Sequence, residues 1–422
     1  MSFDDLSRDQ IQALFDEQTA AYRALQERGL KLDLTRGKPS PEQLDLSNEL
    51  LSLPGADFKD ASGTDTRNYG GLTGLLELRE IFAPIMRVPV EQVVAGDNAS
   101  LAMMHDNLVF ALFHGVPDSE QPWGVEESVK FVCPAPGYDR HFALLEEYGI
   151  EMVTVPMNAD GPDVDAVREA VKDPAVKGMW LVPTYSNPTG AVISEAVAAE
   201  LAALETAAPD FRIFWDNAYA VHDLTDQQTK TPDILGLCVA SGHPNRPVIF
   251  ASTSKITFAG AGVSFLGSSP DNIAWYLRHL GKRTIGPDKV NQLRHARYLG
   301  STEGVHALME RHRAILAPKF ETVVTILRDR LAEYGIADWT EPAGGYFVSL
   351  DVLDGTASRV VELTREAGVA MTPAGAAFPY GEDPRDRNIR IAPSFPSPDD
   401  LATAIDVLAT SVLIAAAEQY LA

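Results

Sequence analysis

Lys255 lies just after an apolar run, residues 248–251, on a loop that carries hydroxyl groups and glycines. The loop begins at Ser252 and continues to the glycine-containing segment 259–262. An amine in this position can form a Schiff base with a carbonyl group, whereas most lysines that follow a strand are solvated surface residues. A dinucleotide-binding loop is excluded, because Phe265 stands where that fingerprint needs its third glycine.

Two other apolar runs end in polar side chains that would suit a pyridine ring. Asp216 follows the run 212–215, and a carboxylate buried at such a strand end needs a cationic partner, such as a protonated pyridine nitrogen. A plain helix N-cap is the alternative for Asp216. Asn187 follows the run 179–182, and its amide, together with the Tyr219 hydroxyl, could donate to a phenolic oxygen of the ring. An ordinary Asn-Pro turn is the alternative here.

A phosphate group would fit the turn 96–100, which joins the expected strand 92–95 to a helix. The first backbone N–H groups of a helix have no partner within the helix, and they attract anions. Helix capping without a ligand explains the same turn equally well. The candidate phosphate contacts are Ala99, Ser100, Ser252 and Ser254.

Two further residues complete the expected pocket. Tyr138 ends the proline-containing segment 134–138, where its ring could stack on a cofactor or simply pack on the loop. Arg390 stands between apolar residues in the segment 388–392. A buried arginine needs an anionic partner, which could be a substrate carboxylate or an internal acid.

Short apolar runs that alternate with helical segments predict the elements that position these residues. The expected strands are 92–95, 129–133, 152–155, 179–182, 212–215 and 248–251. Right-handed crossovers make such a sheet mostly parallel, with helices on both faces and its ligand site at the carboxyl ends of the strands. The fold class is therefore α/β.

The chain ends predict a smaller α/β domain. A helix over 10–28 and an extended piece over 32–35 come first, and a long helix over 306–334, strands over 346–350 and 389–392 and a helix over 401–420 come last. We expect a large domain over 50–300 and a small domain formed by 1–49 and 301–422.

Composition restricts the partners. The chain has 35 basic and 59 acidic residues and a net charge of −24, which disfavours nucleic acid and anionic membranes. Its two cysteines, Cys133 and Cys238, form no disulfide framework, and residues 1–8 do not have the pattern of a signal peptide. No metal site is indicated, and a cytoplasmic location is expected.

The order of these residues along the chain resembles that of class I aminotransferases of pyridoxal 5′-phosphate (PLP) fold type I. The motif residues are Tyr69, Asn187, Asp216, Tyr219, Lys255 and Arg390. The resemblance implies a seven-stranded-type sheet between helices and a homodimer with shared active sites. It also implies that Lys255 carries PLP and that Asp216 pairs with the pyridine nitrogen. Asn187 and Tyr219 would contact the phenolic oxygen, Tyr138 would stack on the ring, and Arg390 would bind the substrate carboxylate.

The sequence departs from the family at Val263, where a phosphate-binding arginine is usual. Tyr69 matches the family's tyrosine that reaches the phosphate of the neighbouring subunit. The loops around Lys255, 36–39 and 288–295 are similar to those of a divergent bacterial aspartate aminotransferase subgroup, which favours a dicarboxylic substrate. The further substrate-binding candidates are Gly37, Arg36, Lys289 and Arg294, the last two in either subunit.

The expected reaction moves an amino group, most simply from aspartate, to a 2-oxo acid such as 2-oxoglutarate by a ping-pong mechanism. Alternatives on the same fold are an alanine, aromatic or aminoadipate-type aminotransferase and a β-lyase. A non-catalytic PLP-fold sensor is the alternative from another class. Regulators of that kind carry a basic DNA-binding module ahead of this fold, and only about 30 residues precede Leu32.

Overall fold

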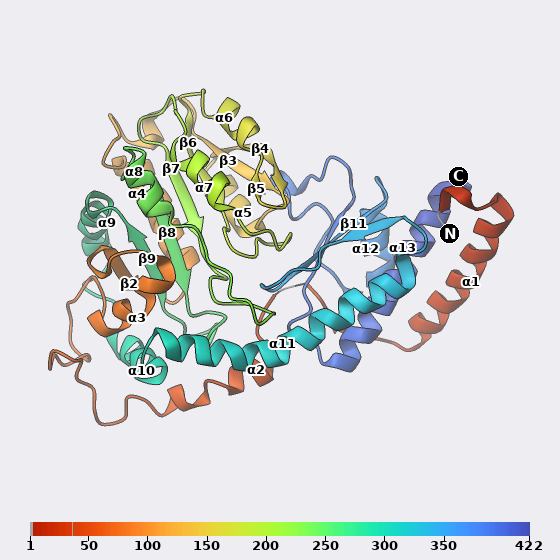
Figure 1. Ribbon diagram of the computed structural model, residues 1–422, viewed down its shortest axis with the longest axis horizontal. Coiled ribbons are helices and arrows are strands. Elements are labelled where there is room, and N and C mark those ends of the chain that lie inside the picture. The colour runs from red at the N-terminus through yellow and green to blue at the C-terminus, as the bar shows by residue number, and fades with distance from the viewer. Residues whose placement is uncertain (1–2, 36) are drawn as a thin grey trace.

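The computed structural model describes residues 3–35 and 37–422. Figure 1 shows a larger lobe built around a sheet and a smaller lobe that contains both chain ends. The strands of the large sheet are β2 (Val93–Gly96), β3 (Lys130–Ala135), β4 (Glu151–Asn158), β5 (Gly161–Pro162), β6 (Val176–Leu181), β7 (Arg212–Asp216), β8 (Pro247–Ser252) and β9 (Ser264–Ser268).

The strand order in the described sheet is β2-β9-β8-β7-β6-β3-β4-β5. The central pairs β8–β7, β7–β6, β6–β3 and β3–β4 are parallel, and antiparallel pairs stand at both edges. The six strands expected from the sequence are confirmed within a few residues. The described sheet has eight strands, one more than the seven that the family resemblance implies, and the two-residue edge strand β5 is the shortest of them.

Helices cover both faces of this sheet, as the buried strands require. They are α3 (Leu76–Met86), α4 (Ser100–His114), α5 (Asp139–Glu147), α6 (Val164–Ala170), α7 (Glu195–Ala202), α8 (Ile234–Ala240), α9 (Pro270–Arg283) and α10 (Lys289–Leu299). Neighbouring residues of one strand enter different cores: Ile213 and Trp215 pack on one face of the sheet and Phe214 on the other. This alternation follows from the two-residue period of a strand.

The smaller lobe combines residues from both ends of the chain. Its helices are α1 (Arg8–Glu27), α2 (Pro41–Asp45), α11 (Thr302–Leu331), α12 (Ala357–Glu366) and α13 (Pro398–Leu421). Its strands are β1 (Leu32–Asp33), β10 (Ala337–Trp339), β11 (Val348–Val352), β12 (Val369–Ala370) and β13 (Asn388–Ile391). The terminal helices and the strands expected at residues 346–350 and 389–392 are confirmed.

Helix α11 belongs to both lobes. Val305 and Leu308, near its start, pack in a core of the large sheet, whereas Val323 and Leu327 pack with α1 and α13. Figure 1 shows this helix running from the larger lobe into the smaller one. A domain boundary near residue 300 therefore stays a prediction, since the helix that begins there continues through both cores.

Helix α13 is apolar enough and long enough, by composition alone, to span a bilayer, but 78% of its most apolar window is buried inside the fold. Leu401, Leu408 and Leu413 are among its core residues. Packing in the small lobe therefore accounts for the apolar character of this helix.

Candidate active site

A cavity of about 470 Å³ lies between the carboxyl ends of the parallel strands and the smaller lobe. Several residues expected from the sequence line it: Gly37, Tyr138, Asn187, Tyr219, Lys255 and Arg390. They come from separate segments of the chain, most of which meet here because parallel strands end at the same edge of a sheet. The other lining residues are Thr35, Lys38, Asp139, Arg140, Phe347, Thr372 and Pro373.

Lys255 follows the last residues of β8 and lies near two aromatic rings. Its Nζ lies 4.9 Å from the centroid of the Tyr219 ring and 5.9 Å from that of Tyr346. Burial lowers the pKa of Lys255 below its usual value, and the negative charge of Asp216 opposes this shift. A lysine in such surroundings is neutral over a wider pH range than a surface lysine, as a nucleophile or a base must be.

Asp216 is the last residue of β7, and only 2% of it is exposed. His141 Nε2 lies 3.1 Å from its Oδ2 atom. The Oδ1 atom is buried and has no hydrogen-bond partner among residues 3–35 and 37–422. Asp216 is not among the residues that line the cavity. A buried carboxylate oxygen without a donor is nevertheless costly, so Asp216 Oδ1 is suited to accept a hydrogen bond from a cationic group that binds beside Lys255.

Arg390, on β13, is 7% exposed and has two kinds of partner. Its Nη1 donates to Oδ1 of Asp139 at 2.8 Å and to Oδ1 of Asn187 at 3.3 Å. The Nη2 atom makes one long contact of 3.4 Å with Thr372, and Nε has no partner in the described chain. The Nε–Nη2 edge of the guanidinium can therefore still bind a planar carboxylate through two hydrogen bonds.

Two tyrosines give the cavity its aromatic walls. Tyr138 caps the start of α5 and meets the His141 ring edge-on, with centroids 4.9 Å apart. Burial and the charge of Asp216 raise the pKa of Tyr138 to about 12. Burial also raises the pKa of Tyr219 well above its usual value, so both hydroxyls keep their protons and act as donors.

Gly37 lies directly against Phe347. A Cβ atom at Gly37 would come within 2.6 Å of Cζ of the Phe347 ring. The guanidinium of Arg390 lies over the same ring, with Cζ 5.1 Å from its centroid. Because glycine has no side chain, the backbone at position 37 can pack directly against the Phe347 ring, which also contacts Arg390.

The expected phosphate contacts lie at the start of α4 and at the end of β8. Ala99 is the N-cap of α4 and supplies no side-chain hydrogen bond, so the first N–H groups of this 15-residue helix are uncapped. Ser100, Ser252 and Ser254 make no side-chain hydrogen bond within the described chain. Val263, where the family usually has an arginine, is buried.

Two expected substrate-binding residues, Lys289 and Arg294, are not brought to this cavity within one chain. Lys289 Nζ donates to the backbone oxygen of Tyr69 at 3.2 Å, and Arg294 Nε donates to that of Leu53 at 2.6 Å. Neither side chain lines the cavity at Lys255. Arg36 lies outside the described residues. Tyr69 is 81% exposed and does not line the cavity of its own chain.

Sequence reasoning missed four contributors: Asp139, Arg140, His141 and Tyr346. His141 stands three residues after Tyr138, a spacing that places both on one side of the helix start, and this was the available signal. The Tyr346 hydroxyl accepts a hydrogen bond from Gln43 at 2.9 Å. Gln43 lies on α2, and nothing in the sequence indicates this long-range contact.

Comparisons with known proteins identify one enzyme family over nearly the whole chain. The family model described as aspartate amino-transferase matches residues 6–422. An aspartate aminotransferase of Corynebacterium glutamicum is 58% identical over 421 residues, which cover 100% of this chain and 98% of that protein. The crystal structure of an aspartate transaminase from that species superposes with a TM-score of 0.97 at 57% identity, covering 100% of this chain and 99% of the other.

A more distant structure shares the fold. The alpha-aminoadipate aminotransferase of Thermus thermophilus, complexed with N-(5′-phosphopyridoxyl)-L-leucine, superposes with a TM-score of 0.75 at 21% identity. The match covers 94% of this chain and 95% of that one. The α/β architecture is thus that of the fold type I aminotransferases.

Proposed function

Since the chain belongs to the aspartate aminotransferase family and is an aminotransferase, we propose that it transfers the amino group of aspartate to 2-oxoglutarate with PLP as its cofactor. The observation that carries the proposal is one cavity lined by Lys255 and Arg390, with the buried carboxylate of Asp216 close enough to Lys255 to raise its pKa against the effect of burial. These residues supply a carboxylate with one buried oxygen that has no partner in the described chain, an amine of lowered pKa and a guanidinium with an unoccupied edge.

The residues present fit PLP. Oδ1 of Asp216 is a buried acceptor without a donor, which suits the protonated nitrogen of a pyridine ring. Tyr138 would stack on the ring, and Asn187 and Tyr219 would donate to its phenolic oxygen. When bound, the cofactor supplies an electron sink for the electrons released at the α-carbon of the substrate.

The phosphate group would be held mainly by neutral donors. The uncapped start of α4 at Ala99 and Ser100 provides N–H groups and the positive end of a helix dipole. The hydroxyls of Ser252 and Ser254 have no competing partners in the described chain. Tyr69 of the partner subunit would add a further contact. This proposal needs no phosphate-binding arginine at position 263, where the buried Val263 packs in the core.

Arg390 orients the substrate. Asp139 and Asn187 hold Nη1 in place, and the Nε–Nη2 edge receives the α-carboxylate of the amino acid. The fixed arginine sets the direction of the Cα–H bond and brings it toward Nζ of Lys255. Positioning of this kind contributes a large part of the rate of a proton transfer.

Lys255 moves the proton. Its amine is neutral more readily than that of a free lysine, so Nζ can accept the α-proton of the bound amino acid and release it again within the same cavity. Tyr219 and Tyr346 exclude water from two sides of Nζ. Proton loss to bulk solvent is thereby limited while Lys255 holds the proton.

We also propose a cytoplasmic homodimer with shared active sites. Tyr69 and Ile285 are large, mostly exposed residues, and their loops touch, since a Cβ atom at Gly286 would lie 2.5 Å from the backbone oxygen of Gly70. Covering such a surface with a second copy of the chain would remove apolar groups from water.

Product analysis with single amino acids tests the activity. Aspartate and 2-oxoglutarate should give oxaloacetate and glutamate, and aspartate alone should give about one oxaloacetate per subunit before the reaction stops, as a ping-pong mechanism requires. Alanine, an aromatic amino acid and 2-aminoadipate serve as comparisons. Preferred use of one of these over aspartate would contradict the substrate assignment, and release of pyruvate with ammonia would indicate a lyase.

A further inference from the structure

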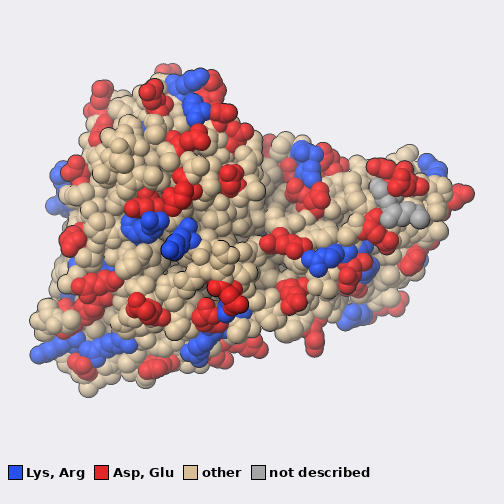
Figure 2. All heavy atoms as spheres, viewed as in Figure 1, with Lys and Arg blue, Asp and Glu red and all other residues tan. Residues whose placement is uncertain are grey.

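The cavity at Lys255 is basic although the protein is acidic. The whole chain has a net charge of −24, and Figure 2 shows acidic side chains spread over both lobes. Among the described residues that line the cavity, four are basic and one is acidic: Lys38, Arg140, Lys255, Arg390 and Asp139. A basic cavity in an acidic protein concentrates small anions and favours those with more than one negative charge.

Three of these four basic residues already have a partner or a proposed role in the reaction. Lys255 is the proposed cofactor lysine, and Arg390 is held by Asp139. Lys38 lies 3.6 Å from a carboxylate oxygen of Asp33, and its Nζ lies 3.8 Å from the centroid of the Phe395 ring. Each of these cations is therefore engaged by a neighbour or by the reaction.

Arg140 differs from them. Within residues 3–35 and 37–422 it forms no hydrogen bond and no ion pair, although it lines the cavity. It is the second residue of α5, where the positive end of the helix dipole disfavours a cation. An unpaired arginine at this position does not stabilise the helix. Arg140 is exposed, so water solvates its guanidinium in the absence of a ligand. An anion in the cavity would pair with this free cation and would also offset its unfavourable interaction with the dipole.

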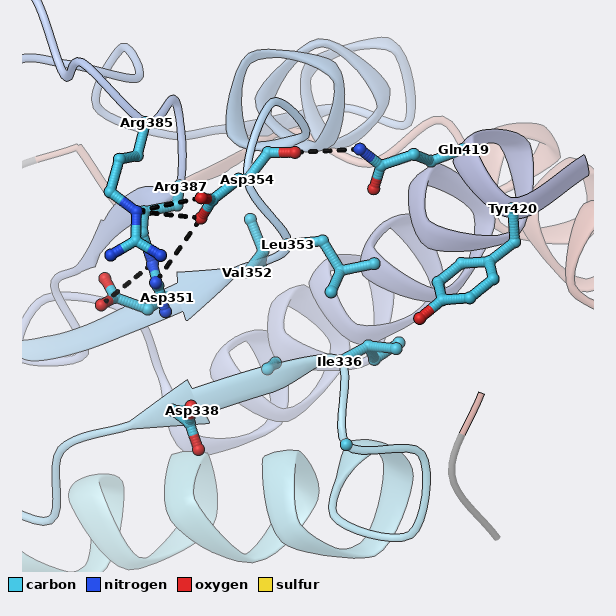
Figure 3. A pocket seen from close by; sticks show the side chains of 12 residues that line it. Ile336, Asp338, Asp351, Val352, Leu353, Asp354, Arg385, Arg387, Gln419 and Tyr420 are labelled. Atoms are coloured by element: carbon cyan, nitrogen blue, oxygen red, sulfur yellow. Dashed lines mark hydrogen bonds and ion pairs between the residues drawn. The ribbon is translucent and has the colours of Figure 1, made fainter. Parts of the chain in front are cut away.

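The other arginines near cavities do not share this property. A cavity of about 520 Å³ in the small lobe holds Arg385 and Arg387, whose guanidinium groups both point at acids (Figure 3). Arg385 Nε lies 3.0 Å from Asp354, and Arg387 Nε lies 3.3 Å from Asp351. These charges are already neutralised, so that cavity offers no free cation to a ligand.

The backbone places Arg140 beside the proposed carboxylate site. Asp139, which contacts Arg390, is the residue that directly precedes Arg140 in α5. Successive residues of a helix point about 100° apart, so Asp139 can face Arg390 while Arg140 faces another part of the same cavity. Two guanidinium groups then border one cavity of about 470 Å³.

We propose that Arg140 binds the side-chain carboxylate of a dicarboxylic substrate, while Arg390 binds its α-carboxylate. This inference rests on the proposed aminotransferase reaction and names the residue that selects its substrate class. Both carboxylates are bound by the subunit that supplies Lys255. Lys289 and Arg294 are not required for this selection, since their side chains engage backbone oxygens elsewhere in the chain.

The test compares Arg140→Gln and Arg140→Lys with Arg365→Gln, which removes the same charge from an exposed site on α12. For Arg140→Gln, kcat/KM for aspartate should fall by roughly 10- to 100-fold, because a charge-assisted hydrogen bond is lost. The value for alanine should change by less than about twofold, since alanine has no second carboxylate. Arg140→Lys should recover part of the loss, and Arg365→Gln should behave as the unmodified enzyme.

Ligand binding separates this inference from the proposed function. Succinate, which does not react, should bind roughly 10- to 100-fold more weakly to the Arg140→Gln holoenzyme, whereas propionate should bind equally to both proteins. Equal losses for aspartate and alanine, or unchanged succinate binding, would overturn the role of Arg140. A selective loss in Lys38→Gln instead would assign the role to Lys38. If the unmodified enzyme fails to use aspartate, the proposed substrate is wrong, and the succinate measurement still decides the role of Arg140.

Discussion

The Nε2 atom of His141 lies 3.1 Å from Oδ2 of Asp216, and this contact leaves the other carboxylate oxygen of Asp216 buried and unpartnered in the described chain. The His141 ring is itself fixed by stacking on Trp180, with centroids 4.3 Å apart and planes 13° apart. The histidine therefore orients the carboxylate so that Oδ1 alone is presented to a ligand. Helix α5, which carries His141, and strand β7, which carries Asp216, therefore jointly position this carboxylate.

Loss of this contact should weaken cofactor binding without abolishing it. In His141→Ala, Asp216 loses a charge-assisted hydrogen bond, so the dissociation constant for PLP should rise by roughly tenfold or more. Titration of the apoprotein with PLP measures this change. His306→Ala, which alters a partly exposed histidine on α11, is the matched control. An unchanged dissociation constant for His141→Ala would show that Asp216 is oriented by other contacts.

Replacement of Lys255 by alanine should remove the absorbance of the lysine-bound cofactor and all turnover. The reason is chemical: no other amine lines the described cavity except that of Lys38, which is paired with Asp33. Reduction with borohydride and then peptide mass analysis should find the cofactor on Lys255 in the unmodified enzyme. Normal transamination by Lys255→Ala would show that Lys255 is not the catalytic lysine.

The lowered pKa of Lys255 predicts how the apoprotein reacts with amine reagents. A lysine whose pKa is lowered by burial loses its proton at lower pH, and only the neutral amine reacts, so its labelling should rise at a pH below the usual lysine value of about 10.4. Lys282, which is exposed, is the internal control. Because Asp216 raises the pKa of Lys255, Asp216→Asn should move the labelling midpoint to still lower pH. A shift in the opposite direction would contradict the electrostatic coupling of the two residues.

Residues at the ends of strands were predictable from the sequence. Asn187, Asp216 and Lys255 each come after a short apolar run, and parallel strands deliver such residues to one edge. The antiparallel strand β9 was missed, because the segment 264–268 has two serines and a glycine and no β-branched residue. Arg140 was also missed, since an arginine at a helix start is unremarkable until its lack of partners in the described chain is seen in three dimensions.

The negative charge of Asp139 should weaken the binding of a carboxylate to Arg390. In Asp139→Asn the amide oxygen can still accept from Nη1 of Arg390, but the negative charge next to the guanidinium is gone. Because Asp139 is only partly buried, the gain should be modest: propionate should bind about two- to fivefold more tightly to the holoenzyme. Calorimetric titration measures this. Weaker binding would show that the charge of Asp139 is needed to position Arg390.

Hybrid dimers can decide where Tyr69 acts. Tyr69 is 81% exposed in its own chain, and we expect it to contact the cofactor phosphate of the partner subunit. Tyr69→Ala and Lys255→Ala should each be impaired as homodimers. In a hybrid of the two, one site combines the intact Lys255 of one chain with the intact Tyr69 of the other, and the second site lacks both. Equal mixing by co-expression should therefore restore about a quarter of the normal activity, because about half of the dimers are hybrids and each has one complete site. If Tyr69 instead served the site of its own chain, every site in the mixture would lack one residue, and no activity beyond that of the parent variants would return.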